Sequence, residues 1–151
     1  MQLRLFKVFL FLLSGIFYSQ SKQQPMKDCI CYTNADSTLS KPYYNPAHSL
    51  VIKSKKPKVF SLSGGRVSKI IKDNNLYTII IQSNNLFYIY SNLAFIPKKI
   101  KMDKYIRKNK WLGNGSLLKN NYSIELQIYN KTNILSDIKK YVKCTEAPQS
   151  R

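Results

Sequence analysis

Residues 59–142 consist of short β-forming runs separated by glycine, asparagine and aspartate, and this pattern constrains the fold more than any other feature. Residues 76–82 and 86–90 are rich in β-branched and aromatic side chains, and the Ser-Asn-Asn sequence between them can adopt the left-handed backbone of a hairpin turn. Residues 124–129 alternate apolar and polar side chains, as in a strand with one buried face. No segment carries an apolar stripe of helical spacing longer than about two turns. The sequence therefore predicts an all-β domain with an antiparallel, sandwich-like core, in which the first two runs pair as a hairpin.

Two further places in the sequence predict special backbone conformations. The Gly64-Gly65 pair lies between two short apolar stretches, which indicates a tight bend or bulge with positive φ. Asp103 and Asn109 interrupt a lysine-rich segment, and both residue types tolerate the turn conformations usually given to glycine.

The first residues have the order of a secretory signal peptide. Arg4 and Lys7 are followed by an uncharged, mostly apolar run over residues 8–17 and then by small or polar residues. This run is short for a bilayer span, so we expect cleavage near residues 19–21, with an uncleaved membrane anchor as the alternative. We expect an exported protein, located in the periplasm, at the cell surface or outside the cell, without a transmembrane helix after cleavage. The predicted organisation is a signal peptide (1–20), an irregular N-terminal arm (21–47), one β domain (48–143) and a tail (144–151).

The chain is strongly basic, with a formal net charge of +18. Such a charge attracts anionic partners such as cell-wall polymers, lipid headgroups or nucleic acid, whereas the alternative explanation is a lysine-rich compositional bias. Few arginines lie outside the signal region, and specific nucleic-acid contacts rely mainly on arginine, so we expect no nucleic-acid partner. The densest lysine clusters are residues 52–58 and 97–110. The basic surface predicted to bind an anionic polymer contains Lys98, Lys99 and Lys101.

The cysteines of the chain are Cys29, Cys31 and Cys144. A disulfide can form in the oxidising compartment expected for an exported protein. Cysteines two residues apart pair poorly because their side chains diverge, so the expected bridge joins Cys29 or Cys31 to Cys144. Three reduced thiols are the alternative, and a C-x-C pair with one distant cysteine indicates a metal site only weakly.

The order and spacing of these pieces resemble the β-sheet core of the lysostaphin/LytM-type peptidoglycan zinc endopeptidases. Residues 59–67 resemble the family's strand that enters a glycine bend, and residues 90–93 resemble its tyrosine-small-histidine-leucine hairpin end. Residues 100–113 fit a family turn segment without a gap, with Asp103 and Asn109 in glycine places. The resemblance extends over residues 48–142 and implies the duplicated hybrid motif of that family.

The resemblance implies a zinc site that this chain has largely lost. His48 takes the place of the first histidine of the family's H-x-G-x-D-type motif, but Ile52 takes the place of its aspartate. Ser123 and Glu125 stand where the last strand has a histidine-x-histidine pair, and Asn92 stands for the histidine of the hairpin. A catalytic zinc needs three protein ligands and an open position, and His48 and Glu125 could supply two at most. We therefore expect no catalytic residue, no metal and no cofactor.

A fold of this family without its zinc site is expected to bind rather than to hydrolyse. The leading hypothesis is an exported, non-catalytic domain that binds peptidoglycan or another anionic envelope polymer, or that regulates a cell-wall hydrolase such as an amidase. Tyr88, Tyr90 and Gln127 are the candidate groove contacts. Two alternatives stay open, an active metallopeptidase with an unusual metal site and a secreted basic protein that binds membranes or surfaces.

Overall fold

The computed structural model describes residues 22–33, 49–131 and 137–146, which form an all-β domain. The strands are β1 (Ile30–Thr33), β2 (Leu50–Ser54), β3 (Lys58–Phe60), β4 (Gly65–Asp73), β5 (Leu76–Ser83), β6 (Leu86–Phe95), β7 (Tyr105–Ile106), β8 (Trp111–Leu118), β9 (Asn121–Asn130) and β10 (Thr145–Glu146), with one 3-10 turn, η4 (Ile138–Lys140). The predicted fold class is confirmed. Within these ranges no helix has the length and apolar character needed to cross a membrane. The predicted signal peptide and His48 lie outside the described residues.

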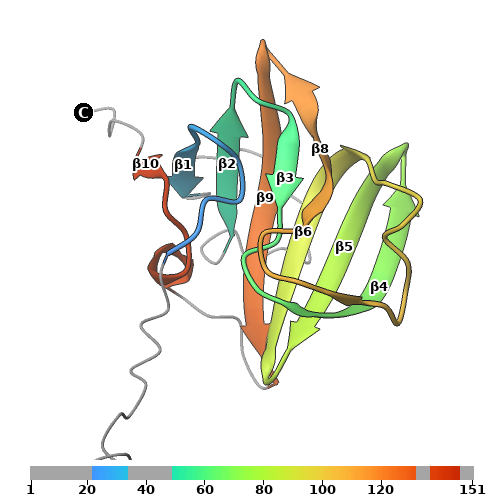
Figure 1. Cartoon of the computed structure of the whole chain (residues 1–151). Helices are drawn as coiled ribbons and strands as arrows, with labels where there is room; N and C mark the ends of the chain where they lie inside the picture. Colours follow the sequence, from blue (N-terminus) through green and yellow to red (C-terminus); the bar gives the residue numbers. More distant parts are fainter. Residues whose placement is uncertain (1–21, 34–48, 132–136, 147–151) are drawn as a thin grey trace, which may run out of the picture.

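All ten strands belong to one sheet in the order β10-β1-β2-β9-β8-β6-β5-β4-β7, with β3 paired to β8 (Figure 1). Every strand pair is antiparallel except β1 with β10. β6 also pairs directly with β9, while β8 pairs with both of them. This mutual pairing of three strands folds the sheet over its own inner face and gives the sandwich-like core.

The core is the inner face of this folded sheet. On β9, Ile124, Leu126 and Ile128 are fully buried, as the alternating sequence predicts. Fully buried side chains from other strands meet them: Ile52, Val59, Val67, Ile79, Tyr90, Leu93 and Leu112, together with Met26. The strands therefore hold together chiefly because each contributes its inward-facing apolar side chains to one continuous core.

The predicted hairpin and left-handed turn residues are present. β5 and β6 pair from Ser83↔Leu86 onward, and Asn84 in the turn has a φ of 53°. Asp103 and Asn109 have φ values of 64° and 60°, so they adopt the conformation expected from their glycine-like places. Asparagine and aspartate tolerate this backbone because their short side chains hydrogen-bond locally.

The prediction of positive φ at the Gly64-Gly65 pair is wrong, because no glycine in the described ranges has a positive φ. Gly65 begins β4 in an extended conformation, and a Cβ atom there would lie closer than 3.0 Å to the carbonyl oxygen of Gln82 on β5. Close approach of two backbones, rather than a left-handed turn, is what requires a residue without a side chain at this position.

The predicted N-terminal arm is not wholly irregular. Its residues 30–33 form β1, which extends the sheet beside β2, and the predicted tail begins with β10. A disulfide joins Cys29 to Cys144. The parallel pairing Ile30↔Thr145 places these two cysteines side by side, whereas Cys31 is opposite Glu146 and keeps a free, buried thiol. Register therefore decides which of the two candidate cysteines is bridged.

Replacing Gly113 should test the close packing of β8 against the end of β6. A Cβ atom on Gly113 would lie closer than 3.0 Å to the carbonyl oxygen of Phe95. We expect Gly113→Ala to lower the free energy of unfolding by about 1–3 kcal/mol, the usual cost of overpacking. The control is Gly64→Ala, where the nearest atom is the hydroxyl of the exposed Tyr105 side chain at 3.0 Å. Urea denaturation that gives equal losses for the two variants would contradict this packing.

Thiol titration should report the disulfide directly. An oxidised chain that is denatured without reductant should expose one thiol, because two of its three cysteines are bonded. The native protein should react slowly, because burial raises the pKa of the Cys31 thiol to about 12 and keeps it protonated. Reduction should lower the free energy of unfolding by about 2–4 kcal/mol. Cys31→Ser is the control, which should remove the remaining thiol and keep the bond, and three reactive thiols before reduction would refute the pairing.

Candidate functional site

The positions at which the resemblance implies zinc ligands or catalytic histidines lie on β2 (Ile52), β6 (Asn92) and β9 (Ser123 and Glu125), apart from His48. Ser123 on β9 is opposite Lys53 on β2, and Glu125 is opposite both Val51 on β2 and Ser91 on β6. Directly paired residues of neighbouring strands project to the same face of a sheet. We call the face that carries these five residues the Glu125 face.

Ile52 does not lie on the Glu125 face. It pairs with Ile124, and both side chains are fully buried in the core on the other side of the sheet. Because successive side chains of a strand point to opposite faces, the neighbours Val51 and Lys53 are the β2 residues that accompany Ser123 and Glu125. The structure thus separates Ile52 from the two positions with which it was expected to form a site.

Asn92 is the extra residue of a β-bulge. Its φ is 63°, and the register of β5 and β6 shifts between Ile79↔Tyr90 and Tyr77↔Leu93. The additional residue allows Tyr90 and Leu93, three positions apart, to face the core together. Asn92 therefore has a definite structural task in this chain, at the place where the family resemblance implies a histidine.

The described part of the Glu125 face carries hydrogen-bonding groups. The hydroxyl of Tyr129 donates to Oε1 of Gln127 at 3.2 Å, further along β9. Burial, and then the Glu125 carboxylate, raises the pKa of Tyr129, so this hydroxyl keeps its proton at neutral pH. Within residues 22–33, 49–131 and 137–146, no three His, Cys, Asp or Glu side chains gather closely enough to hold a metal ion.

The prediction of groove contacts at Tyr88, Tyr90 and Gln127 is wrong, because all three side chains are buried. The hydroxyl oxygen of Tyr90 accepts a hydrogen bond from the Leu62 backbone N–H at 2.8 Å, and burial raises its pKa. Tyr88 faces the same core and makes an edge-on contact with the ring of Tyr141, with 6.4 Å between centroids. Because side chains alternate along a strand, the sequence predicts that Tyr88 and Tyr90 lie on the same face of β6. The structure shows that this is the inner face, since the two tyrosines pair with Ile128 and Leu126 of β9.

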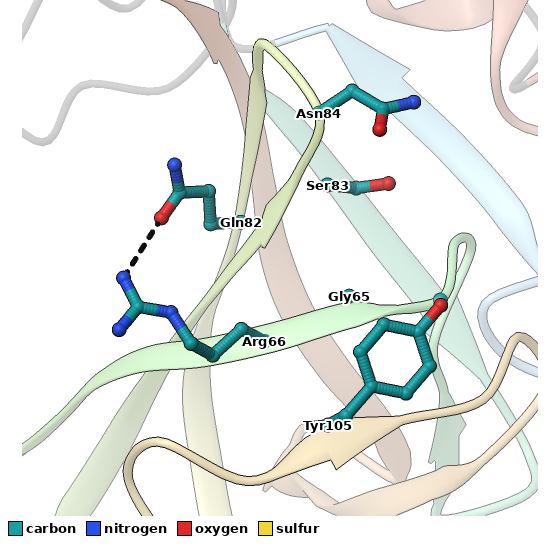
Figure 2. A pocket seen from close by; sticks show the side chains of 7 residues that line it. Gly65, Arg66, Gln82, Ser83, Asn84 and Tyr105 are labelled. Atoms are coloured by element: carbon teal, nitrogen blue, oxygen red, sulfur yellow. Dashed lines mark hydrogen bonds between the residues drawn. The ribbon is translucent and has the colours of Figure 1, made fainter.

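A pocket of about 360 Å³ opens where β4 begins, beside the β5–β6 turn (Figure 2). Arg66 donates to Oε1 of Gln82 at 3.1 Å and to Oδ1 of Asp103 at 3.0 Å. The ring of Tyr105 lies across the pocket from Gln82, and Ser83 and Asn84 line its rim. Sequence reasoning missed this pocket, because its only local signal was the Gly-Gly-Arg sequence. Since Arg66 is already paired twice, its main effect is to hold the segment around Asp103 against β4 and β5.

Lysines and two aromatic rings form a second exposed site, which we call the cationic-aromatic patch. Phe95 is 48 % exposed, and its ring centroid lies 6.0 Å from that of Trp111. Two ammonium groups lie near the Trp111 ring, Lys99 Nζ at 5.7 Å and Lys58 Nζ at 5.9 Å from its centroid. The patch consists of Lys58, Phe95, Lys98, Lys99, Lys101 and Trp111.

The predicted basic surface belongs to this patch. Lys98, Lys99 and Lys101 are exposed, whereas Pro97 and Ile100 between and beside them are buried. The Ile100 backbone N–H donates to the Pro97 carbonyl oxygen at 2.9 Å, which closes the turn that carries the lysines. Burial of the apolar residues thus turns the charged side chains outward. The patch therefore places several positive charges beside two partly exposed aromatic rings.

No protein-family model matches the sequence, and no curated protein matches it either. Solved structures do share the fold. Helicobacter pylori Csd3 in its hexagonal crystal has a TM-score of 0.58 and 17 % identity over 82 % of this chain, and in its orthorhombic crystal the same TM-score and identity over 85 %. A chain in the structure of the SpoIIQ-SpoIIIAH pore forming complex has a TM-score of 0.58 and 15 % identity over 81 % of this chain and 90 % of its own length.

This chain has the all-β core of the LytM/lysostaphin type. It spans 33 % of the Csd3 chain in the hexagonal crystal. At such low identity the likeness concerns the fold, so the residues of this chain must carry any argument about its chemistry.

Zinc analysis tests the loss of the metal site. We expect the purified chain to retain no stoichiometric zinc after dialysis. Among Val51, Lys53, Ser123 and Glu125 on the Glu125 face, Glu125 is the one residue of a type that commonly binds zinc, and Ile52 lies on the other face. Elemental analysis with a chelator-treated control measures this. About one tightly bound zinc per chain, lost on Glu125→Gln or His48→Ala, would overturn the expectation and favour the metallopeptidase alternative.

Proposed function

We propose that this protein is an exported, non-catalytic domain of the cell envelope that binds peptidoglycan or another anionic envelope polymer. The observation that carries the proposal is a LytM-type fold whose family positions hold Ile52, Asn92, Ser123 and Glu125. The signal-peptide pattern at the N-terminus supports export. Regulation of a cell-wall hydrolase such as an amidase is the related role that the same fold would allow.

Two of the positions at which the resemblance implies a zinc ligand or a catalytic histidine have structural tasks in this chain. Ile52 fills the core and Asn92 forms the bulge that keeps Tyr90 and Leu93 inside. Neither side chain can act as a general base, and on the Glu125 face the half-buried Glu125 has no histidine beside it in the described residues. Binding is therefore the function that these residues support better than hydrolysis.

The cationic-aromatic patch is the binding surface we propose. Lys98, Lys99 and Lys101 project from a turn that is fixed by the buried Pro97 and Ile100, and Lys58 joins them from β3. The nearest carboxylate in sequence, Asp103, already pairs with Arg66 and does not neutralise them. An anionic polymer would gain contacts with several ammonium groups at once, while the rings of Phe95 and Trp111 could pack against sugar faces.

Charge reversal at the patch tests this proposal. We expect the triple variant Lys98→Glu, Lys99→Glu and Lys101→Glu to bind purified peptidoglycan sacculi at least about tenfold more weakly, because three exposed attractions become repulsions. Binding of the unaltered chain should weaken as salt screens these charges. Co-sedimentation across a salt series measures both effects.

The matched control reverses three exposed lysines elsewhere, Lys22→Glu, Lys69→Glu and Lys143→Glu, with the same change in net charge. Equal losses for the two triple variants would show that only net charge matters and would remove the patch from the proposal. Release of soluble muropeptides by the unaltered chain would instead establish hydrolysis. Stimulation of a purified amidase without direct sacculus binding would favour the regulatory role.

A further inference from the structure

The tip of the β8–β9 hairpin is an exposed apolar point, and nothing in the proposed function uses it. Leu117 and Leu118, adjacent in sequence, are 66 % and 54 % exposed. In Figure 1 the turn that joins β8 to β9 reaches beyond the neighbouring ends of β2 and β3. Successive side chains of a strand point to opposite faces, so Leu117 and Leu118 lie on the two sides of the hairpin, and both would meet an apolar partner that the tip approaches end-on.

The tip has a defined shape. The pairs Leu117↔Tyr122 and Leu118↔Asn121 continue the ladder to its end. Lys119 and Asn120 close it with φ values of 45° and 65°, the pattern of a two-residue type I′ turn. The Lys55 Nζ also donates to the Asn120 carbonyl oxygen at 3.2 Å, which ties the tip to the turn after β2. The leucines are therefore presented by paired backbone.

Lysines surround the tip. Lys119 lies in the turn itself, and Lys55 and Lys56 follow the end of β2, where Ser54 pairs with Tyr122 of β9. All three side chains are exposed. Lys27 is also close, because its carbonyl oxygen accepts a hydrogen bond from the Ser54 hydroxyl at 2.5 Å.

The charge at the tip is positive overall. Residues 54–58 and 114–122 contain no acidic side chain, and the carboxylate next to Lys27 belongs to Asp28. Of these lysines, Lys55 places its ammonium group at the turn itself, on the Asn120 carbonyl oxygen. Long lysine side chains keep their charge in water while their apolar stems can lie along an apolar surface.

We propose that the β8–β9 tip docks on an anionic lipid bilayer, with Leu117 and Leu118 entering the interface and the surrounding lysines contacting lipid phosphates. Apolar insertion and electrostatic attraction act together in such binding, since neither two leucines nor a few lysines suffice alone. This surface is separate from the cationic-aromatic patch and does not depend on the function proposed for that patch.

A bilayer fits this tip better than a folded protein does. Two leucines and a two-residue turn present far less than the roughly 800 Å² that each partner contributes to a standard protein interface. A convex tip also requires a matching hollow in a protein partner, whereas lipids rearrange around it. A stiff polysaccharide could bind the lysines through its negative charges, but it would leave the two leucine side chains exposed to water.

Vesicle co-sedimentation of the full chain tests the proposal, with phosphatidylcholine vesicles compared with mixed phosphatidylcholine and phosphatidylglycerol vesicles. We expect binding to the mixed vesicles, weakened by salt, and at least about tenfold weaker binding for the double variant Leu117→Ser and Leu118→Ser. The control double variant, Ile71→Ser and Met102→Ser, changes two exposed apolar residues elsewhere and should bind as the unaltered chain does. Thermal melting should show that both variants stay folded.

A second measurement uses tryptophan fluorescence to report the surroundings of the tip directly, whatever residues 1–21 do. In the Leu118→Trp variant, the emission gained over the unaltered chain should shift to the blue with the mixed vesicles and stay unchanged with pure phosphatidylcholine. An unshifted emission, or equal binding by the serine variant and the unaltered chain, would overturn the proposal. So would leucine-dependent binding to sacculi without binding to vesicles. Loss of sacculus binding in the patch variant, with vesicle binding intact, would concern only the proposed function.

Discussion

The structure depends on the pairing of β9 with three other strands. β2 lies along one edge of β9, while β6 and β8 share the other edge and also pair with each other. Because β8 must reach both, the sheet folds over and encloses Ile124, Leu126 and Ile128, the fully buried side chains of β9. The ends of the described chain join the same sheet, because β1 pairs with β2, β10 pairs with β1, and the Cys29–Cys144 bond links the two segments.

The pairing of β9 also decides on which face of the sheet the positions implied by the family resemblance lie. Ile52 and Glu125, which the resemblance places at zinc-ligand positions, lie on opposite faces of the sheet, and Glu125 is accompanied there by Val51 and Ser123. Asn92 stabilises a bulge, and Ile52 stabilises the core. The fold can therefore persist without metal, because its stability comes from packed apolar side chains and from backbone pairing rather than from coordination.

Two surfaces are available for binding, and they differ in chemistry. The cationic-aromatic patch presents lysines beside the rings of Phe95 and Trp111, which suits an anionic polymer. The β8–β9 tip presents Leu117 and Leu118 among lysines, which suits the surface of a bilayer. Trp111 begins β8 and Leu118 ends it, so the two surfaces lie at opposite ends of this strand.

The sequence by itself determined the all-β class, the β5–β6 hairpin and the left-handed turns at Asp103 and Asn109, because alternation and turn chemistry are local properties. Only the tertiary structure decided which face of each strand is buried. Side chains alternate between the two faces of a strand, so a shift of β2 by one residue would bury Val51 in place of Ile52. In the same way, the register of β6 on β9 places Tyr88 and Tyr90 on the inner face. Register likewise selected Cys29 rather than Cys31 as the partner of Cys144. The exposure of Leu117 and Leu118 was also undecided by the sequence, because it depends on how far the hairpin extends beyond its neighbours.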